Sequence, residues 1–169
     1  RVLLFTASNF TPNVEALHGF LLPFVRTHAP LLARLRLHLL VVGSVSRESW
    51  NEPHLTVTGK VPRVEPYFAA ADFALNATLR GSGTNVKMAE YMAAGLPILT
   101  AAAGLRGYDL IAGEDCVTFD SRNFADVLGH TWLFDDAERA KAMAARAHAK
   151  NRAVVSMKEA IRPLADALA

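Results

Sequence analysis

The chain has 169 residues, of which 51% are hydrophobic and 20% are charged, a composition typical of a folded domain rather than a disordered segment. Its formal net charge of +2 is too small to indicate a nucleic-acid surface or a polybasic membrane anchor. The single cysteine, Cys116, excludes an internal disulfide and a cysteine-based zinc site.

In the first half of the chain, short apolar runs alternate with helical patterns. Residues 2–6 form an apolar, partly β-branched run that predicts a strand, and residues 12–27 carry apolar side chains at helical spacing. Two further strands are expected at residues 35–42 and 55–58. One or two helical turns are expected at residues 64–70.

The second half repeats this alternation and then becomes helical. Strands are expected at residues 72–76, 97–100 and 116–119, and a helix at residues 84–94. From residue 122 onward the pattern is mostly helical. The most apolar stretch is broken by glycines and a proline and is too short to span a bilayer, so we expect no transmembrane segment.

Strands that are apolar on both faces and alternate with helices favour a parallel sheet covered by helices on both sides. We therefore predict a single doubly wound, Rossmann-like α/β domain, with its core in residues 1–120 and a helical tail in residues 121–169. In such sheets, ligands bind outside the carboxyl ends of the strands. The loops to consider follow Thr6, Gly43, Thr58, Asn76 and Thr100.

The most informative segment is the turn between the strand at residues 72–76 and the helix that follows it. Gly81 and Gly83 let the backbone approach a ligand closely, and the first backbone N–H groups of the helix are free to bind an anion. Thr84 or Asn85 can cap this helix or donate to phosphate oxygens. The segment predicts a phosphate-binding turn, although its spacing matches neither the P-loop nor the dinucleotide fingerprint.

Lys87 and Glu90 lie three residues apart on one face of this helix. A cation near the turn and a carboxylate one turn further on suit a diphosphate and an adjacent ribose, because the ammonium offsets charge and the carboxylate accepts from vicinal hydroxyls. The alternative is structural, since such turns occur in every doubly wound domain and the two side chains could form an exposed ion pair. Both interpretations stay open on these residues alone.

Residues 81–100 (GSGTNVKMAEYMAAGLPILT) resemble the donor-binding signature of retaining glycosyltransferases with the GT-B fold, often called family 4 or glycosyl transferases group 1. The similarity extends to residues 58–61 and 66–72, which resemble the family's G-x-V and Y-x-x-A-D segments, and to Pro12-Asn13 after the first strand. These enzymes have two Rossmann-like domains. The resemblance, with a chain that does not begin with Met, implies the C-terminal, nucleotide-sugar-binding domain without its N-terminal acceptor domain.

The resemblance also implies roles for single residues. Glu90 stands in place of the family's second motif glutamate, which binds the ribose of the donor nucleotide, whereas Ser82 stands where the first glutamate is expected. The variant Ser82-Gly83-Thr84-Asn85 is then expected to bind the donor diphosphate or sugar through backbone amides and hydroxyls.

The basic residues that hold the diphosphate in the family are missing after the first strand, in residues 8–13. Arg80 and Lys87 are the nearest candidates to replace them, and Arg106 is a further cation that could meet a phosphate. By the same resemblance, the loop Gly59-Lys60-Val61 is expected to lie against the nucleobase through backbone groups.

We expect neither a metal nor any cofactor other than the nucleotide-sugar substrate. The six histidines show no metal-binding spacing, and a metal site needs several convergent ligands. Glycosyltransferases of the GT-B type commonly act without a bound metal, so the resemblance points the same way.

The first hypothesis is a bacterial-type glycosyltransferase that moves a sugar from a nucleotide-diphosphate sugar to an unknown acceptor. We expect it in the cytoplasm, either free or at the inner face of the membrane through the missing part. No catalytic residue can be assigned, and the isolated chain is expected to bind nucleotide without turnover. The alternative is a non-catalytic GT-B-like module, kept for protein interaction or scaffolding, in which Ser82 marks a degenerate site.

Overall fold

The computed structural model describes residues 1–81 and 85–151. In these residues a seven-stranded sheet forms the centre, with strand order β3-β4-β2-β1-β5-β6-β7. Neighbouring strands are parallel, except that β3 pairs with β4 in the antiparallel direction. The strands are β1 (Val2–Thr6), β2 (His38–Val42), β3 (Trp50–Glu52), β4 (Leu55–Val57), β5 (Phe73–Asn76), β6 (Ile98–Ala101) and β7 (Val117–Phe119).

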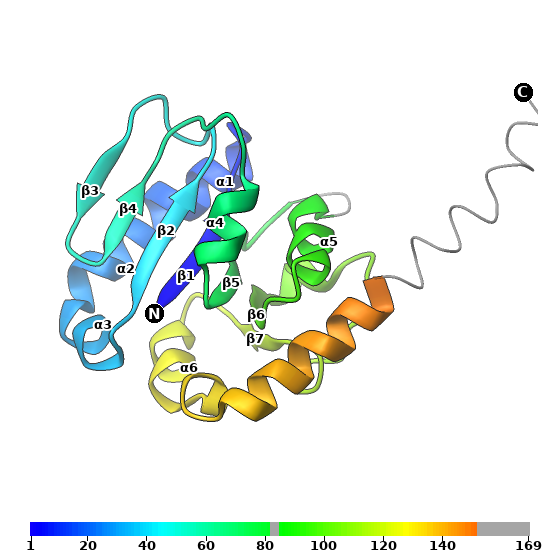
Figure 1. Ribbon diagram of the computed structural model, residues 1–169. Coiled ribbons are helices and arrows are strands. Elements are labelled where there is room, and N and C mark those ends of the chain that lie inside the picture. The colour runs from blue at the N-terminus through cyan, green and yellow to red at the C-terminus, as the bar shows by residue number, and fades with distance from the viewer. Residues whose placement is uncertain (82–84, 152–169) are drawn as a thin grey trace, which may run out of the picture.

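Helices cover both faces of the sheet (Figure 1). The larger hydrophobic cluster lies under α1 (Thr11–Glu15), the π-helical segment η1 (Ala16–Leu21), α2 (Leu22–Thr27), α3 (Ala29–Leu35) and α6 (Phe124–His130). The smaller cluster, on the opposite face, lies under α4 (Glu65–Ala70), α5 (Val86–Ala93) and the end of a helix over residues 137–151. Two short 3-10 helices are η2 (Ala102–Leu105) and η3 (Trp132–Phe134).

Successive residues of the central strands pack into different clusters. In β5, Phe73 and Leu75 belong to the larger cluster and Ala74 to the smaller one, and in β6 Leu99 and Ile98 divide in the same way. Side chains alternate across a strand, so a sheet with helices on both faces needs apolar residues at every position. The predicted doubly wound, Rossmann-like sheet is confirmed.

Two local predictions were wrong. Leu35 was expected in a strand, but it ends α3, Arg36 follows in the left-handed conformation (φ 54°), and β2 begins only at His38. The leucine-rich segment from Leu31 to Leu40 spans the end of a helix and the start of a strand, and the leucine pattern alone does not separate the two. The antiparallel strand β3 was missed because Trp50-Asn51-Glu52 contains a single apolar residue, whereas β4 and β7, which are equally short, lie in apolar runs.

Among the helices that the structure describes, none has the length and apolar character needed to cross a membrane.

Candidate functional site

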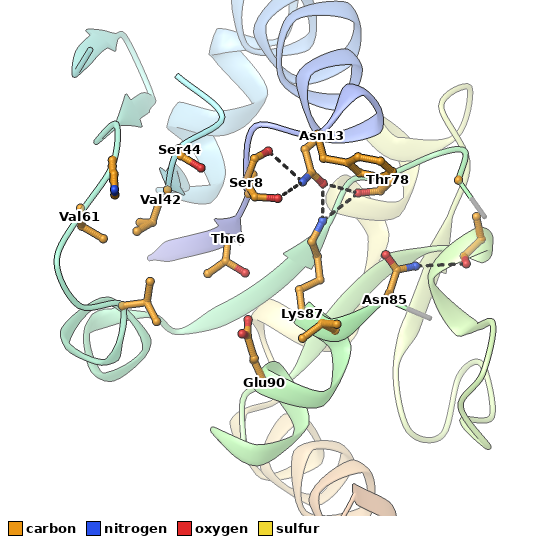
Figure 2. Close-up of a pocket in the computed structure, with 18 of the residues that line it drawn as sticks. Thr6, Ser8, Asn13, Val42, Ser44, Val61, Thr78, Asn85, Lys87 and Glu90 are labelled. Atoms are coloured by element: carbon orange, nitrogen blue, oxygen red, sulfur yellow. Dashed lines mark hydrogen bonds between the residues drawn. The ribbon is translucent and has the colours of Figure 1, made fainter. Parts of the chain in front are cut away.

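A pocket of about 540 Å³ opens at the carboxyl ends of the strands (Figure 2). The loops after β1, β2, β4 and β5 line it, together with the first turns of α5 and one residue of η2. These are the loops at which the doubly wound topology predicts a ligand. The size suits a small molecule such as a nucleotide.

The loops after β1 and β2 are held against each other at one wall of the pocket. Gly43 has φ +123°, and a Cβ placed there would lie 2.5 Å from the Ala7 carbonyl oxygen, so only glycine fits. The Gly43 amide donates to the Gly59 carbonyl (3.2 Å), and the Val45 amide donates to the Ala7 carbonyl (3.0 Å). Three loops are thereby joined by backbone contacts, which gives the pocket a fixed wall.

The pocket extends to the point where the strand order reverses, between β1 and β5. Their ladder pairs Leu3 with Phe73 and Leu4 with Ala74, near the start of the two strands. Further along, the fully buried Tyr91 hydroxyl accepts from the Thr6 amide (2.9 Å) and donates to the Leu75 carbonyl (3.0 Å). The phenol thus bridges β1 and β5 beyond the end of their ladder, beside the crevice that α5 overlies.

Lys87 projects from the first turn of α5 to the floor of the pocket (Figure 2). Its ammonium donates to Asn13 Oδ1 (2.7 Å) and Thr78 Oγ1 (3.0 Å), and it lies 4.6 Å from the centre of the Phe5 ring. Burial lowers the pKa of Lys87 to about 8, and the negative charge of Glu90 offsets this only in part. The site therefore holds a cation among uncharged oxygens and a ring.

Glu90 is exposed and points into the pocket on the Thr6 side, away from the bonds that Lys87 makes (Figure 2). The two side chains form no ion pair with each other, although both belong to the described chain. The structural alternative, in which Lys87 and Glu90 form an exposed ion pair, is therefore not observed. A cation and a carboxylate face one pocket at separate places.

The predicted phosphate-binding turn is described only at its two ends, because Ser82, Gly83 and Thr84 lie outside the described residues. Asn85 occupies the N-cap position of α5, but its side chain makes no capping bond and its Nδ2 donates to the Ala103 carbonyl (3.5 Å). Arg106 donates to the carbonyl of Gly81 instead of lining the pocket.

Of the remaining residues predicted to bind the donor, three line the pocket and one does not. Arg80, Lys60 and Val61 line it, whereas Gly59 lies behind the lining with its carbonyl bonded to Gly43. Their roles toward a diphosphate or a nucleobase stay predictions, as do those of Lys87 and Glu90.

The sequence did not single out the polar cluster that receives Lys87. Asn13, from α1, is 5% exposed and also donates from Nδ2 to the Ser8 carbonyl (3.1 Å), and Thr78 follows β5. Asn13 appeared in the resemblance only as part of Pro12-Asn13, and Thr78 stood at the start of the most informative segment without a role of its own. Asn13 lies 74 residues from Lys87 in the chain, and Thr78 lies nine residues away in a different element, so only the fold brings the three side chains together.

Within the described part of the chain, no group of three or more side chains is placed to hold a metal ion. All six histidines contact neighbouring protein groups, for example His38 with Thr56 Oγ1 (2.8 Å) and His148 with the Met92 carbonyl (2.9 Å). Cys116 is buried, and burial raises the pKa of its thiol to about 12, which makes it a core residue and not a nucleophile.

A family model described as "Glycosyl transferases group 1" matches residues 1–149. This chain belongs to the glycosyl transferases group 1 family. No curated protein matches the sequence.

Solved structures similar to this group 1 chain share its fold at low sequence identity. Anabaena HepE in complex with UDP superposes with a TM-score of 0.67 at 14% identity, covering 98% of this chain and 48% of that protein. WaaG, a glycosyltransferase involved in lipopolysaccharide biosynthesis, gives a TM-score of 0.55 at 19% identity, covering 90% and 42%. The C-terminal domain of the Francisella tularensis group 1 protein LpcC gives 0.59 at 14% identity, covering 87% and 81%.

This group 1 chain therefore has the fold of a Rossmann-like half of a GT-B glycosyltransferase. It spans 31% to 48% of the length of the first matched structures. The LpcC match, in which both chains are largely covered, is to a single domain.

Proposed function

We propose that the chain is the donor-binding domain of an enzyme that transfers a sugar from a nucleotide-diphosphate sugar to an acceptor. The observation that carries this proposal is the pocket itself, which presents a half-buried cation, Lys87, and a separate exposed carboxylate, Glu90, at the carboxyl ends of the strands. Two matched proteins of this fold, Anabaena HepE and the pneumococcal O-GlcNAc transferase GtfA, are solved in complex with UDP, and HepE also with UDP-glucose, which supports a nucleotide sugar as the ligand.

The two charges suit the two polar parts of such a donor. When the sugar leaves, the bond between its anomeric carbon and the β-phosphate oxygen breaks, and negative charge develops on the diphosphate. A fixed cation at that place stabilises the departing group, because its charge is already oriented before the reaction begins. Glu90 lies on the other side of the pocket and is free to accept hydrogen bonds from the ribose hydroxyls.

Several finer points belong to the same proposal. Transfer with retention at the anomeric carbon, action without a metal or other cofactor, and an acceptor site on an N-terminal domain outside this chain follow from the family resemblance. A cytoplasmic location follows from the same source. The comparisons lend no support to the alternative of a non-catalytic interaction or scaffolding module.

Calorimetry with UDP, GDP and ADP tests the donor site on the 169-residue chain. We expect heat of binding for at least one nucleotide, and no sugar transfer by the chain alone. Lys87→Ala and Glu90→Ala should each weaken binding by about 1–3 kcal/mol, because each removes a charged hydrogen-bond partner. Lys141→Ala and Glu138→Ala are matched controls, since both side chains are exposed on the helix over residues 137–151, outside the pocket lining.

Absence of heat for all three nucleotides, with the fold intact by circular dichroism, would overturn the proposal. Equal losses in the pocket variants and the surface controls would do the same, because the effect would then reflect net charge and not the site.

A further inference from the structure

The Asn13 side chain is held by both of its ends. Its Nδ2 donates to the Ser8 carbonyl (3.1 Å) and Ser8 Oγ (3.3 Å), so the amide group cannot rotate without losing these bonds. Its Oδ1 accepts from Lys87 Nζ (2.7 Å) and from Thr78 Oγ1 (3.3 Å) (Figure 2). The amide is therefore fixed with its oxygen toward the ammonium.

This arrangement holds the ammonium without neutralising it. Both oxygens that accept from Lys87 Nζ, on Asn13 and Thr78, are uncharged. A carboxylate at 2.7 Å would form an ion pair and remove the positive charge that an anion needs. An amide oxygen at the same place fixes the direction of the ammonium and leaves its charge available.

The other charged groups that line the pocket do not come from β1 or α1. Glu90 lies on the same helix, Arg80 in the loop after β5 and Lys60 in the loop after β4, and all three line the pocket. The lining residues from β1 and α1 are uncharged. Position 13 is thus the place where α1 could neutralise Lys87 and does not.

We propose that Asn13 is a positioning residue that fixes the Lys87 ammonium, with its charge uncompensated, to receive the donor diphosphate. This inference rests on the proposed donor site, and it assigns Asn13 a role that depends on its neutral oxygen and not only on packing.

The test compares Asn13→Asp and Asn13→Ala in the 169-residue chain, with two measurements on each. The first is the pKa of Lys87 in the ligand-free protein, followed by NMR of 13C-labelled lysine and assigned by the signal missing in Lys87→Ala. The second is the affinity for UDP by calorimetry. Asn51→Asp on β3, which is exposed and outside the pocket lining, makes the same change of charge and is the matched control.

We expect the pKa of Lys87 to rise in Asn13→Asp, because a carboxylate favours the ammonium, and to fall in Asn13→Ala, because an acceptor is lost. Both variants should weaken UDP binding about tenfold or more, and Asn51→Asp should leave both quantities unchanged. A role limited to packing would lower stability in both variants without moving the pKa of Lys87 in opposite directions.

Two results separate this inference from the proposed function. An unchanged pKa of Lys87 in both variants, or wild-type UDP affinity in Asn13→Asp, overturns the role of Asn13 while the donor site stands. A wild-type chain that binds no nucleotide overturns the donor site, and the role of Asn13 in diphosphate binding falls with it.

Discussion

At the scale of single residues, the protonation of Lys87 decides what the pocket can attract. Because burial lowers the pKa of this amine to about 8, the ammonium is mostly charged at neutral pH and loses its proton only slightly above it. An anion bound beside it favours the charged form and raises the pKa again. Binding of a diphosphate and protonation of Lys87 are therefore coupled.

We predict that the affinity for UDP is nearly constant from pH 7 to 8 and falls above pH 8 by up to about tenfold per pH unit. The sign follows from the lowered pKa of the free site, since above it each binding event must first take up a proton. The phosphate groups of UDP no longer titrate in this range. Calorimetry from pH 7 to 9.5, in two buffers of different ionisation enthalpy, measures both the affinity and the proton uptake. A flat profile without proton uptake would contradict the coupling.

The sequence predicted Lys87 and Glu90 because both lie on one helix just after a glycine-rich turn, a local pattern. It could not predict the partners of Lys87. Asn13 and Thr78 lie 74 and 9 residues away in the chain, and their bond to each other joins positions 65 residues apart. Contacts of this kind depend on which strands become neighbours, and no spacing rule encodes them.

At the scale of elements, the helix over residues 137–151 is fixed to the loop before β7 by a buried carboxylate. The Asp115 side chain is 2% exposed and accepts from Lys150 Nζ (2.7 Å) and the Ile111 amide (2.8 Å), with Arg146 Nε at 3.7 Å. Burial by itself would raise the pKa of Asp115, but these partners outweigh it and hold the pKa below its usual value of 3.8. The contribution to stability is present above about pH 4 and is lost as pH falls through the lowered pKa.

We predict that Asp115→Asn lowers the free energy of unfolding by about 1–2 kcal/mol at pH 7, because two partly exposed cations lose a buried partner. The effect should be smaller at pH 3, because the contribution of the carboxylate fades as the pH falls below 3.8 toward the lowered pKa of the folded state. Urea unfolding at both pH values measures this. Glu138→Gln, on the solvent side of the same helix, is the control and should leave stability nearly unchanged. A loss as large at pH 3 as at pH 7 would show that the amide, and not the missing charge, is responsible.

Helices and strands with a strong local sequence pattern were predicted, whereas those that depend on contacts with other parts of the fold were not. The strands β1, β4, β5 and β6 and the helix α5 follow apolar runs that turn residues delimit clearly. The strand β3 exists because Trp50 and Glu52 pair with Val57 and Leu55 of β4, which is a tertiary cause. The π-helical turn at Ala16–Leu21 likewise has no signature in an apolar spacing that suits an α-helix.

At the scale of the whole molecule, the sheet consists of two halves that meet at β1 and β5. The order β3-β4-β2-β1 on one side and β5-β6-β7 on the other gives the crevice its place. The alternation of strands and helices predicted the fold class. The order of the strands in the sheet depends on which distant segments pair, and the local sequence pattern does not predict that order. Tyr91 joins the halves where the ladder between them has ended.

We predict that Tyr91→Phe destabilises the whole domain by about 1–3 kcal/mol, because it leaves the buried Thr6 amide without an acceptor and the Leu75 carbonyl without this donor. Thermal unfolding measures the loss as a lower Tm. Tyr67→Phe on α4, a partly exposed position, is the control and should change Tm little. If Tyr91→Phe unfolds at the wild-type temperature, the hydroxyl is not what joins the halves.

The position of Tyr91 beside Glu90 has a mechanical consequence for α5. Neighbouring residues of one helical turn carry the carboxylate that faces the pocket and the hydroxyl that is bonded to two strands. The helix cannot slide or rotate against the sheet without breaking these bonds, so its position beside the pocket is fixed. On the opposite side, the loop after β4 carries Lys60 and Val61 and is joined to the loop after β2 by the bond from the Gly43 amide to the Gly59 carbonyl, so both sides of the pocket are held in place before a ligand binds.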